Sequence, residues 1–136
     1  MPPFLEAALE YARGGWFVFP LQPGGKRPLP GTSGHRDATT DLKTIKRWWR
    51  EVPDANIGIA CSSEVGPLII DIDGPEGMKH LKKLHLPSTL EATSGRKDRK
   101  HLYYSHASER LRRTIKVLPG IDILGDGGYV VAPPSI

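Results

Sequence analysis

Two aspartates end an apolar stretch of the sequence, residues 68–74, which reads Leu-Ile-Ile-Asp-Ile-Asp-Gly. Side chains two positions apart in a strand point to the same face, so Asp71 and Asp73 should project together, opposite the neighbouring apolar side chains. Adjacent carboxylates repel each other and are costly to keep ionised without a cation. Mg²⁺ or Mn²⁺, which prefer oxygen ligands, would relieve that repulsion. The simpler alternative is an Asp-Gly turn at a strand end.

A third carboxylate, Asp122, lies between two isoleucines at the start of a glycine-rich segment, residues 120–128. We expect this carboxylate to be at least half-buried and therefore to need a partner. A metal shared with Asp71 and Asp73 would be one, since three carboxylates are the usual protein share of a two-metal phosphoryl-transfer site. An Arg or Lys partner is the alternative. Asp126 is assigned to the turn itself.

A polar, basic loop, residues 94–100, precedes His101. A loop rich in glycine, hydroxyl groups and positive charge can wrap a triphosphate, and a histidine can donate a hydrogen bond to a phosphate oxygen. Arg96, Lys97, Arg99 and His101 are therefore candidate phosphate ligands. The alternative is an exposed charged loop followed by an ordinary histidine.

A second basic loop, residues 23–28, makes Lys26 a candidate contact for a phosphate or a template strand. It lacks the Gly-x4-Gly-Lys-Ser/Thr spacing of a P-loop. The cationic helix face around Lys46 is interpreted as solvated surface, and Trp48 and Trp49 as core. No Ser-His-Asp order or reactive-cysteine pattern is present to suggest covalent catalysis.

The elements that must position these groups follow from hydrophobic periodicity, with Gly and Pro at their boundaries. We predict helices over residues 5–12, 42–50 and 75–84. We predict strands over residues 16–19, 56–60, 68–73, 101–105, 115–124 and 129–132. The last two strands should form a hairpin around the glycine-rich turn. This mix indicates an α+β fold with a largely antiparallel sheet.

The length, 136 residues, fits one domain with one real core. The net charge of +4 suits a polyanion partner such as nucleic acid or a nucleotide. The single cysteine, Cys61, excludes an internal disulfide and a cysteine-based zinc cluster, and a reducing cytoplasm is the expected location. No apolar run approaches the roughly 20 residues of a membrane span. Residues 1–10 lack the pattern of a signal peptide.

Taken in order, these segments resemble the bifunctional DNA primase/polymerase (Prim-Pol) domain of the archaeo-eukaryotic primase superfamily. The family pattern opens with a helix, a Gly-Trp pair, an aromatic strand and a Gly-Lys-x-Pro loop. The matching segments here are residues 7–12, 15–16, 17–20 and 25–28.

The three catalytic motifs of that family also have counterparts in this sequence. An apolar strand that ends in Asp-x-Asp or Asp-x-Glu is matched by Asp71 and Asp73, and a nucleotide-contacting histidine by His101. An Asp followed by a glycine-rich turn and a Val-x-x-Pro-Pro-Ser stretch is matched by Asp122 and residues 130–135. The resemblance spans nearly the whole chain.

The resemblance implies an RRM-like α+β core whose antiparallel sheet lies under a nucleotidyltransferase site. The implied activity is template-directed synthesis and extension of primers from NTPs or dNTPs on single-stranded DNA. Mg²⁺ or Mn²⁺ would be held by Asp71, Asp73 and Asp122. Such domains are commonly fused to, or associated with, helicases in plasmids, phages and mobile elements.

Two departures from the family pattern stand out. The histidine motif is often Ser-x-His, whereas Arg99 occupies the first position here. The sequence ends at Ile136, where the family domain usually continues, so we expect a single catalytic core over residues 1–136 that is truncated at its C-terminus. Two other functions fit the same residues: a non-catalytic nucleic-acid-binding module of a replication initiator, and a metal-dependent nuclease.

Overall fold

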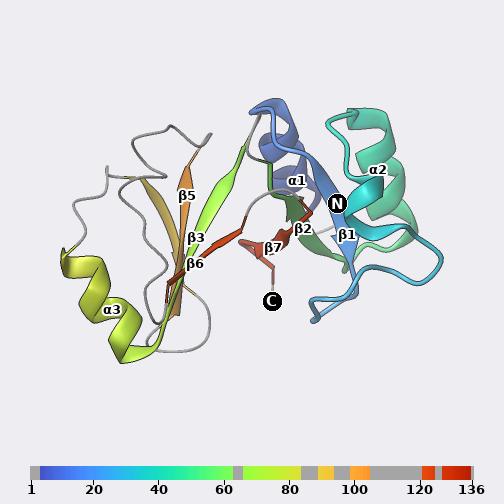
Figure 1. The fold of residues 1–136 in the computed structure, drawn as a ribbon. Coiled ribbons are helices and arrows are strands. Elements are labelled where there is room, and N and C mark those ends of the chain that lie inside the picture. The colour runs from blue at the N-terminus through green and yellow to red at the C-terminus, as the bar shows by residue number, and fades with distance from the viewer. Residues whose placement is uncertain are drawn as a thin grey trace. The chain divides into compact units, whose positions relative to one another are not determined.

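The computed structural model describes residues 4–62, 66–83, 89–93, 99–104, 121–124 and 127–135. The chain divides into two compact units (Figure 1). The first unit contains Met1–Cys61 and Gly127–Ile136, and the second contains Ser62–Asp126. The first unit is thus built from two separate stretches of sequence, and the second unit is the segment inserted between them.

The first unit combines helices with a small antiparallel sheet. Its helices are α1 (Leu5–Arg13), the short 3-10 helix η1 (Gly34–Asp37) and α2 (Leu42–Glu51). Its strands are β1 (Val18–Leu21), β2 (Asn56–Ala60) and β7 (Tyr129–Ala132), in the order β1-β2-β7. The helical periodicity of α1 buries its apolar stripe as predicted: Leu5, Ala8, Leu9 and Ala12.

Helix α2 begins and packs as its sequence predicts. The Asp41 carboxylate accepts a hydrogen bond from the Thr44 N–H at 3.2 Å, which satisfies one of the unpaired donors of the first turn. Ile45 and Trp49 are fully buried. The Trp49 indole N–H donates to the Ala55 carbonyl at 2.9 Å, so this large apolar ring is buried without an unsatisfied donor.

The Pro-Pro-Ser stretch after β7 is hydrogen-bonded to both α1 and β2 of the first unit. The Tyr11 hydroxyl of α1 donates to the Pro133 carbonyl at 2.7 Å. The Ile57 N–H of β2 donates to the Ser135 hydroxyl oxygen at 2.8 Å. In the family pattern this Pro-Pro-Ser stretch follows the motif of Asp122. Here its hydrogen bonds give it a structural role in the first unit.

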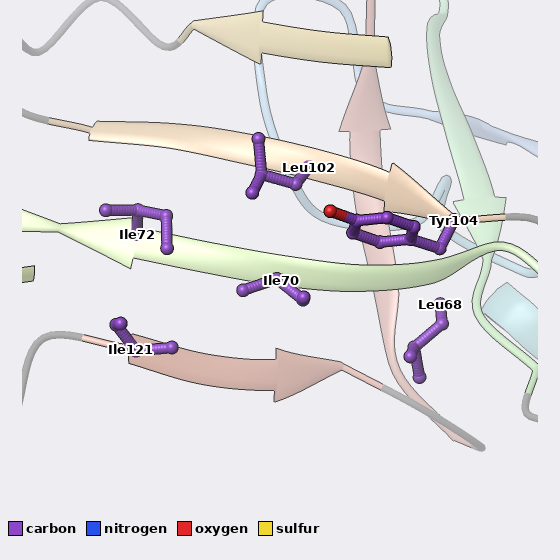
Figure 2. Close-up of a cluster of buried hydrophobic side chains, with 6 residues drawn as sticks. All are labelled: Leu68, Ile70, Ile72, Leu102, Tyr104 and Ile121. Carbon is purple, nitrogen blue, oxygen red and sulfur yellow. The ribbon is translucent and has the colours of Figure 1, made fainter. Parts of the chain in front are cut away.

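In the described part of the second unit, a helix packs against a four-stranded antiparallel sheet. Its elements are β3 (Leu68–Asp73), α3 (Gly74–Lys83), β4 (Leu90–Thr93), β5 (Arg99–Tyr104) and β6 (Ile121–Leu124), with strand order β4-β5-β3-β6. The apolar cluster on one face of the sheet consists of Leu68, Ile70, Ile72, Leu102, Tyr104 and Ile121 (Figure 2). Met78 and Leu81 of α3 pack against this cluster.

The α+β class with antiparallel pairing is confirmed, although the strands of the described ranges divide between two sheets. Strand β1 begins two residues later than predicted and continues through Pro20. Proline is tolerated there because β1 is an edge strand. No helix in the described ranges is long and apolar enough to cross a membrane.

Other strands also differ from the prediction in extent or pairing. Strand β4 was not predicted, and β5 begins at Arg99 rather than at His101. The predicted hairpin is wrong, because β6 pairs with β3 in the second unit whereas β7 pairs with β2 in the first. Leu84, predicted on the apolar face of α3, and residues 105–120 lie outside the described ranges.

Candidate active site

The middle of β3 brings ionisable side chains from three strands onto one face of the sheet. Asp71 lies opposite His101 of β5 on one side and opposite Asp122 of β6 on the other. Asp73 lies opposite Arg99. Directly opposed residues of antiparallel strands project from the same face. We call these five residues, Asp71, Asp73, Arg99, His101 and Asp122, the carboxylate face.

The alternation of β3 explains why the carboxylate face is separate from the core. Ile70 and Ile72 are fully buried and belong to the apolar cluster, whereas Asp71 between them projects to the other side. Asp71 and Asp73, two residues apart in β3, thus project from the same face, as predicted. Because β3 has a neighbour on each side, Asp71 is central in this set.

Arg99 holds Asp71 in a two-point ion pair. Its Nε lies 3.3 Å from Oδ1 of Asp71, and its Nη2 lies 3.2 Å from Oδ2. The two side chains are 25% and 13% exposed, so solvent screens the pair only in part. The hydrogen bonds that Arg99 donates to Asp71, with added attraction from the charges of Asp71 and Asp73, raise the pKa of Arg99 above its already high ordinary value. The guanidinium therefore stays charged.

His101 approaches the same carboxylate. Its Nε2 lies 3.3 Å from Oδ1 of Asp71, and its side chain is 19% exposed. Asp71 can therefore orient the imidazole by accepting a hydrogen bond from it.

Asp73 and Asp122 are both exposed. This corrects the prediction that Asp122 is half-buried. Strand β6 is at the edge of the sheet, and its Ile123 is 42% exposed as well. An exposed carboxylate remains hydrated, so burial does not force Asp122 to find a partner.

The donors of the carboxylate face suit a hard divalent cation. Carboxylate oxygens are the ligands that Mg²⁺ and Mn²⁺ prefer, and the strand register gathers three such groups. However, the described residues contain no set of three or more His, Cys, Asp or Glu side chains already placed to hold a metal. Both oxygens of Asp71 instead face Arg99. The residue types and the register fit such an ion. The Asp71 oxygens that would bind it are the ones that accept hydrogen bonds from Arg99.

The other predicted ligands are not among the five residues of the carboxylate face. Arg96 and Lys97 lie outside the described ranges. Lys26 belongs to the first unit, where its side chain is exposed. Its loop is anchored through the backbone: the Tyr129 hydroxyl donates to the Lys26 carbonyl at 2.8 Å, and the buried Asn56 amide donates to the Gly25 carbonyl at 3.0 Å.

The sequence made Arg99 a candidate phosphate ligand but did not predict its pairing with Asp71. The sequence held a signal for this pairing: Arg99 and His101 are two residues apart, and Leu102 and Tyr103 follow them directly. Extending the predicted strand back by two residues would have placed both on one face.

The basic face of α2 is a second feature, which the sequence analysis assigned to solvated surface. It consists of Lys43, Lys46, Arg47 and Arg50, which follow the i, i+3, i+4, i+7 spacing of one helix face. All four side chains are exposed. None of them forms a salt bridge with another residue in the ranges that the structure describes. We call this set the α2 basic face.

Comparison with known proteins covers both units. Residues 8–136 match the family described as bifunctional DNA primase/polymerase, N-terminal. No curated protein matches the chain. The family match includes the whole carboxylate face, Lys26 and the α2 basic face.

Proposed function

Because the chain belongs to the bifunctional DNA primase/polymerase family, whose general activity is nucleotidyl transfer, we propose that the carboxylate face is its catalytic site. One observation carries this proposal: Asp71 lies in the middle strand, between His101 on one neighbour and Asp122 on the other. Three carboxylates and an imidazole on one sheet face match the demands of phosphoryl transfer, in which positioning and charge stabilisation dominate.

Asp71, Asp73 and Asp122 would hold Mg²⁺ or Mn²⁺, in keeping with a family that is generally metal-dependent. When bound, such ions activate the attacking 3′-hydroxyl and neutralise the triphosphate. The three side chains come from two adjacent strands that are hydrogen-bonded to each other, so the sheet fixes their spacing. Rigid elements position ligands more accurately than loops do.

His101 and Arg99 would contact the phosphates of the incoming NTP or dNTP. Asp71 orients the His101 ring, and the Arg99 guanidinium can make paired hydrogen bonds to phosphate oxygens. Arg96 and Lys97 of the preceding loop would extend this contact, and Lys26 remains a candidate contact for a phosphate or for the single-stranded template. The Arg99 guanidinium is already charged, so its contact with a phosphate would need no titration of the arginine.

The direct test is calorimetric binding of dATP and ATP in the presence of Mn²⁺. We expect the parent protein to bind nucleotide only with the metal, and the variant Asp71→Ala/Asp73→Ala to lose that binding. A matched control, Glu51→Ala/Asp54→Ala, removes two exposed carboxylates from the first unit and should bind as the parent does. Normal binding by the Asp71/Asp73 variant, or no binding by the folded parent, would contradict the proposal.

A second candidate function, a nucleic-acid-binding module, is favoured by the α2 basic face. Four exposed cations on one helix face suit the phosphates of a single strand. If all four contact phosphates, log K for single-stranded DNA should fall with log salt at a slope of about −3. The variant Lys46→Ala/Arg47→Ala should reduce this slope to about −1.5. Binding of DNA that is indifferent to metal, without nucleotide binding, would select this function over the first.

A further inference from the structure

We propose that Arg99 is a built-in counter-ion that competes with the divalent cation for Asp71 and passes to the triphosphate once the cation binds. This inference rests on the proposed function. It gives the residue that departs from the usual Ser-x-His motif a defined role, as a group that links metal binding to nucleotide binding.

The competition follows from the geometry of the ion pair. Arg99 approaches both oxygens of Asp71, at 3.3 and 3.2 Å. A divalent cation at Asp71 would need at least one of those oxygens, and a guanidinium cannot share it without repulsion between two positive groups. The cation therefore has to displace at least one Arg99 contact, which lowers the apparent affinity for metal.

The Arg99 guanidinium also stabilises the metal-free site against repulsion among its carboxylates. Three carboxylates lie on the carboxylate face, and Asp71 is the least exposed of the three. Without a nearby positive charge, the repulsion among them would disfavour the folded second unit. Arg99 offsets one of the three negative charges, and it does so at the central strand position.

The released guanidinium has a suitable destination on the same face. Arg99 is 25% exposed, so its side chain is not locked into the sheet. Its planar fork suits phosphate oxygens as well as carboxylate oxygens. His101, two residues along β5, projects from the same side. Metal and nucleotide should consequently bind with positive coupling, and each should raise the affinity for the other by the same factor.

The test measures Mn²⁺ binding without nucleotide, from the electron paramagnetic resonance signal of free Mn²⁺. The variants are Arg99→Ser, which supplies the common family residue, and Arg99→Gln, which keeps a long polar side chain. Lys100→Ser is the matched control, because it removes one positive charge from the same strand, where Lys100 pairs with Glu91 at 3.6 Å. Folding of each protein is checked by circular dichroism.

We expect both Arg99 variants to bind Mn²⁺ about tenfold more tightly than the parent, a change of ~1.4 kcal/mol. Lys100→Ser should change the affinity by less than about twofold, as for a partly exposed charge outside the site. Saturating dATP should raise the Mn²⁺ affinity of the parent more than that of either Arg99 variant.

Equal or weaker Mn²⁺ binding by the folded Arg99 variants would overturn the inference and leave the metal site standing. Equal enhancement by dATP in the parent and both variants would overturn the transfer of Arg99 to the phosphates. Absence of Mn²⁺ binding in all four proteins would instead refute the proposed metal site, and this inference with it.

Discussion

In the first unit, every residue of β1 is buried, as are four of the five residues of β2. In the second unit, β3 alternates at its end: Ile72 is buried, Asp71 is partly exposed and Asp73 is exposed. The strands of the two units thus have different surroundings. A strand that is buried along its whole length contributes chiefly to stability, whereas a strand that is open over part of one face can present charged groups to a ligand.

The packing partners account for this difference. Strand β1 contacts α1, α2 and η1, so it is covered by helices that flank it in the sequence. Among the described helices, α3 makes the main contact with β3, and it packs on the apolar cluster. We therefore expect substitutions in the first unit to affect mainly stability, and substitutions on the carboxylate face to affect mainly ligand binding and chemistry.

The largest expected effect is on chemistry in the second unit. Asp71→Asn keeps the size of the side chain but removes the charge that would bind metal and that holds Arg99. We expect primer extension to fall by about 10³-fold, with little change in the circular dichroism spectrum. Retention of activity would break the comparison, because the open face would then have no catalytic role.

The next effect should be on stability in the first unit. Trp49 is fully buried, and Trp49→Ala removes its volume and its hydrogen bond to Ala55. We expect a loss of ~3–5 kcal/mol in the free energy of unfolding, measured by urea denaturation. Trp48→Ala is the control, since the neighbouring ring is only half-buried and should cost less. Equal losses from the two variants would show that burial is not the cause.

A smaller effect concerns close packing within the first unit. A methyl group on Gly58 would lie 2.8 Å from Cζ of Phe19, closer than real contacts allow. We expect Gly58→Ala to lower the free energy of unfolding by ~1–3 kcal/mol. The double variant with Phe19→Leu should recover part of this loss, because the smaller side chain removes the clash. Additive losses would place the cost elsewhere.

The smallest effect is a pH dependence at the start of α2. The hydrogen bond from the Thr44 hydroxyl, together with that from its N–H, lowers the pKa of Asp41 below its ordinary value of 3.8. The ionised cap therefore stabilises the fold above pH 3.8, and the contribution disappears as the pH falls through the lower folded-state pKa.

Unfolding curves across pH for the parent, Asp41→Ala and Asp41→Asn would sharpen this point. The difference between the parent and Asp41→Ala should be constant near neutral pH and shrink in acid. Asn retains an acceptor without a titrating charge, so the stability difference between Asp41→Asn and Asp41→Ala should change little. A difference between the parent and Asp41→Ala that stays unchanged as the pH falls far below 3.8 would contradict the assignment.

Local patterns were sufficient for much of this fold. The spacing of apolar residues predicted α1 and α2, and the bounds of β2 and β3 were correct to the residue. These elements carry their own signals: a capping carboxylate before α2, and continuous apolar runs in the two strands. Strand β4 carries none, because Glu91 and Ala92 have little preference for strands.

Strand pairing was less accessible from the sequence. Adjacent strands joined by a glycine-rich turn usually form a hairpin, yet β6 and β7 belong to different sheets. Their partners, β3 and β2, are distant in the sequence, and no local pattern encodes such a choice. The same limit applies to the candidate site. Alternation placed Asp71 and Asp73 on one face, but contact between Asp71 and Arg99 depends on the register of β3 against β5.

The pairing of β2 with β7 also has a consequence for how the chain folds. Ala60 and its register partner Tyr129 are 69 positions apart, counted as 129 minus 60. The Cys61 N–H donates to the Gly128 carbonyl at 2.9 Å, so the chain leaves and re-enters the first unit at adjacent points. During synthesis, β2 leaves the ribosome before β7 does. The backbone donors and acceptors on the β7 side of β2 therefore stay unpaired until β7 has been made. Early compaction of the inserted segment would speed the pairing of β2 with β7, because it reduces the entropy lost in closing a long loop.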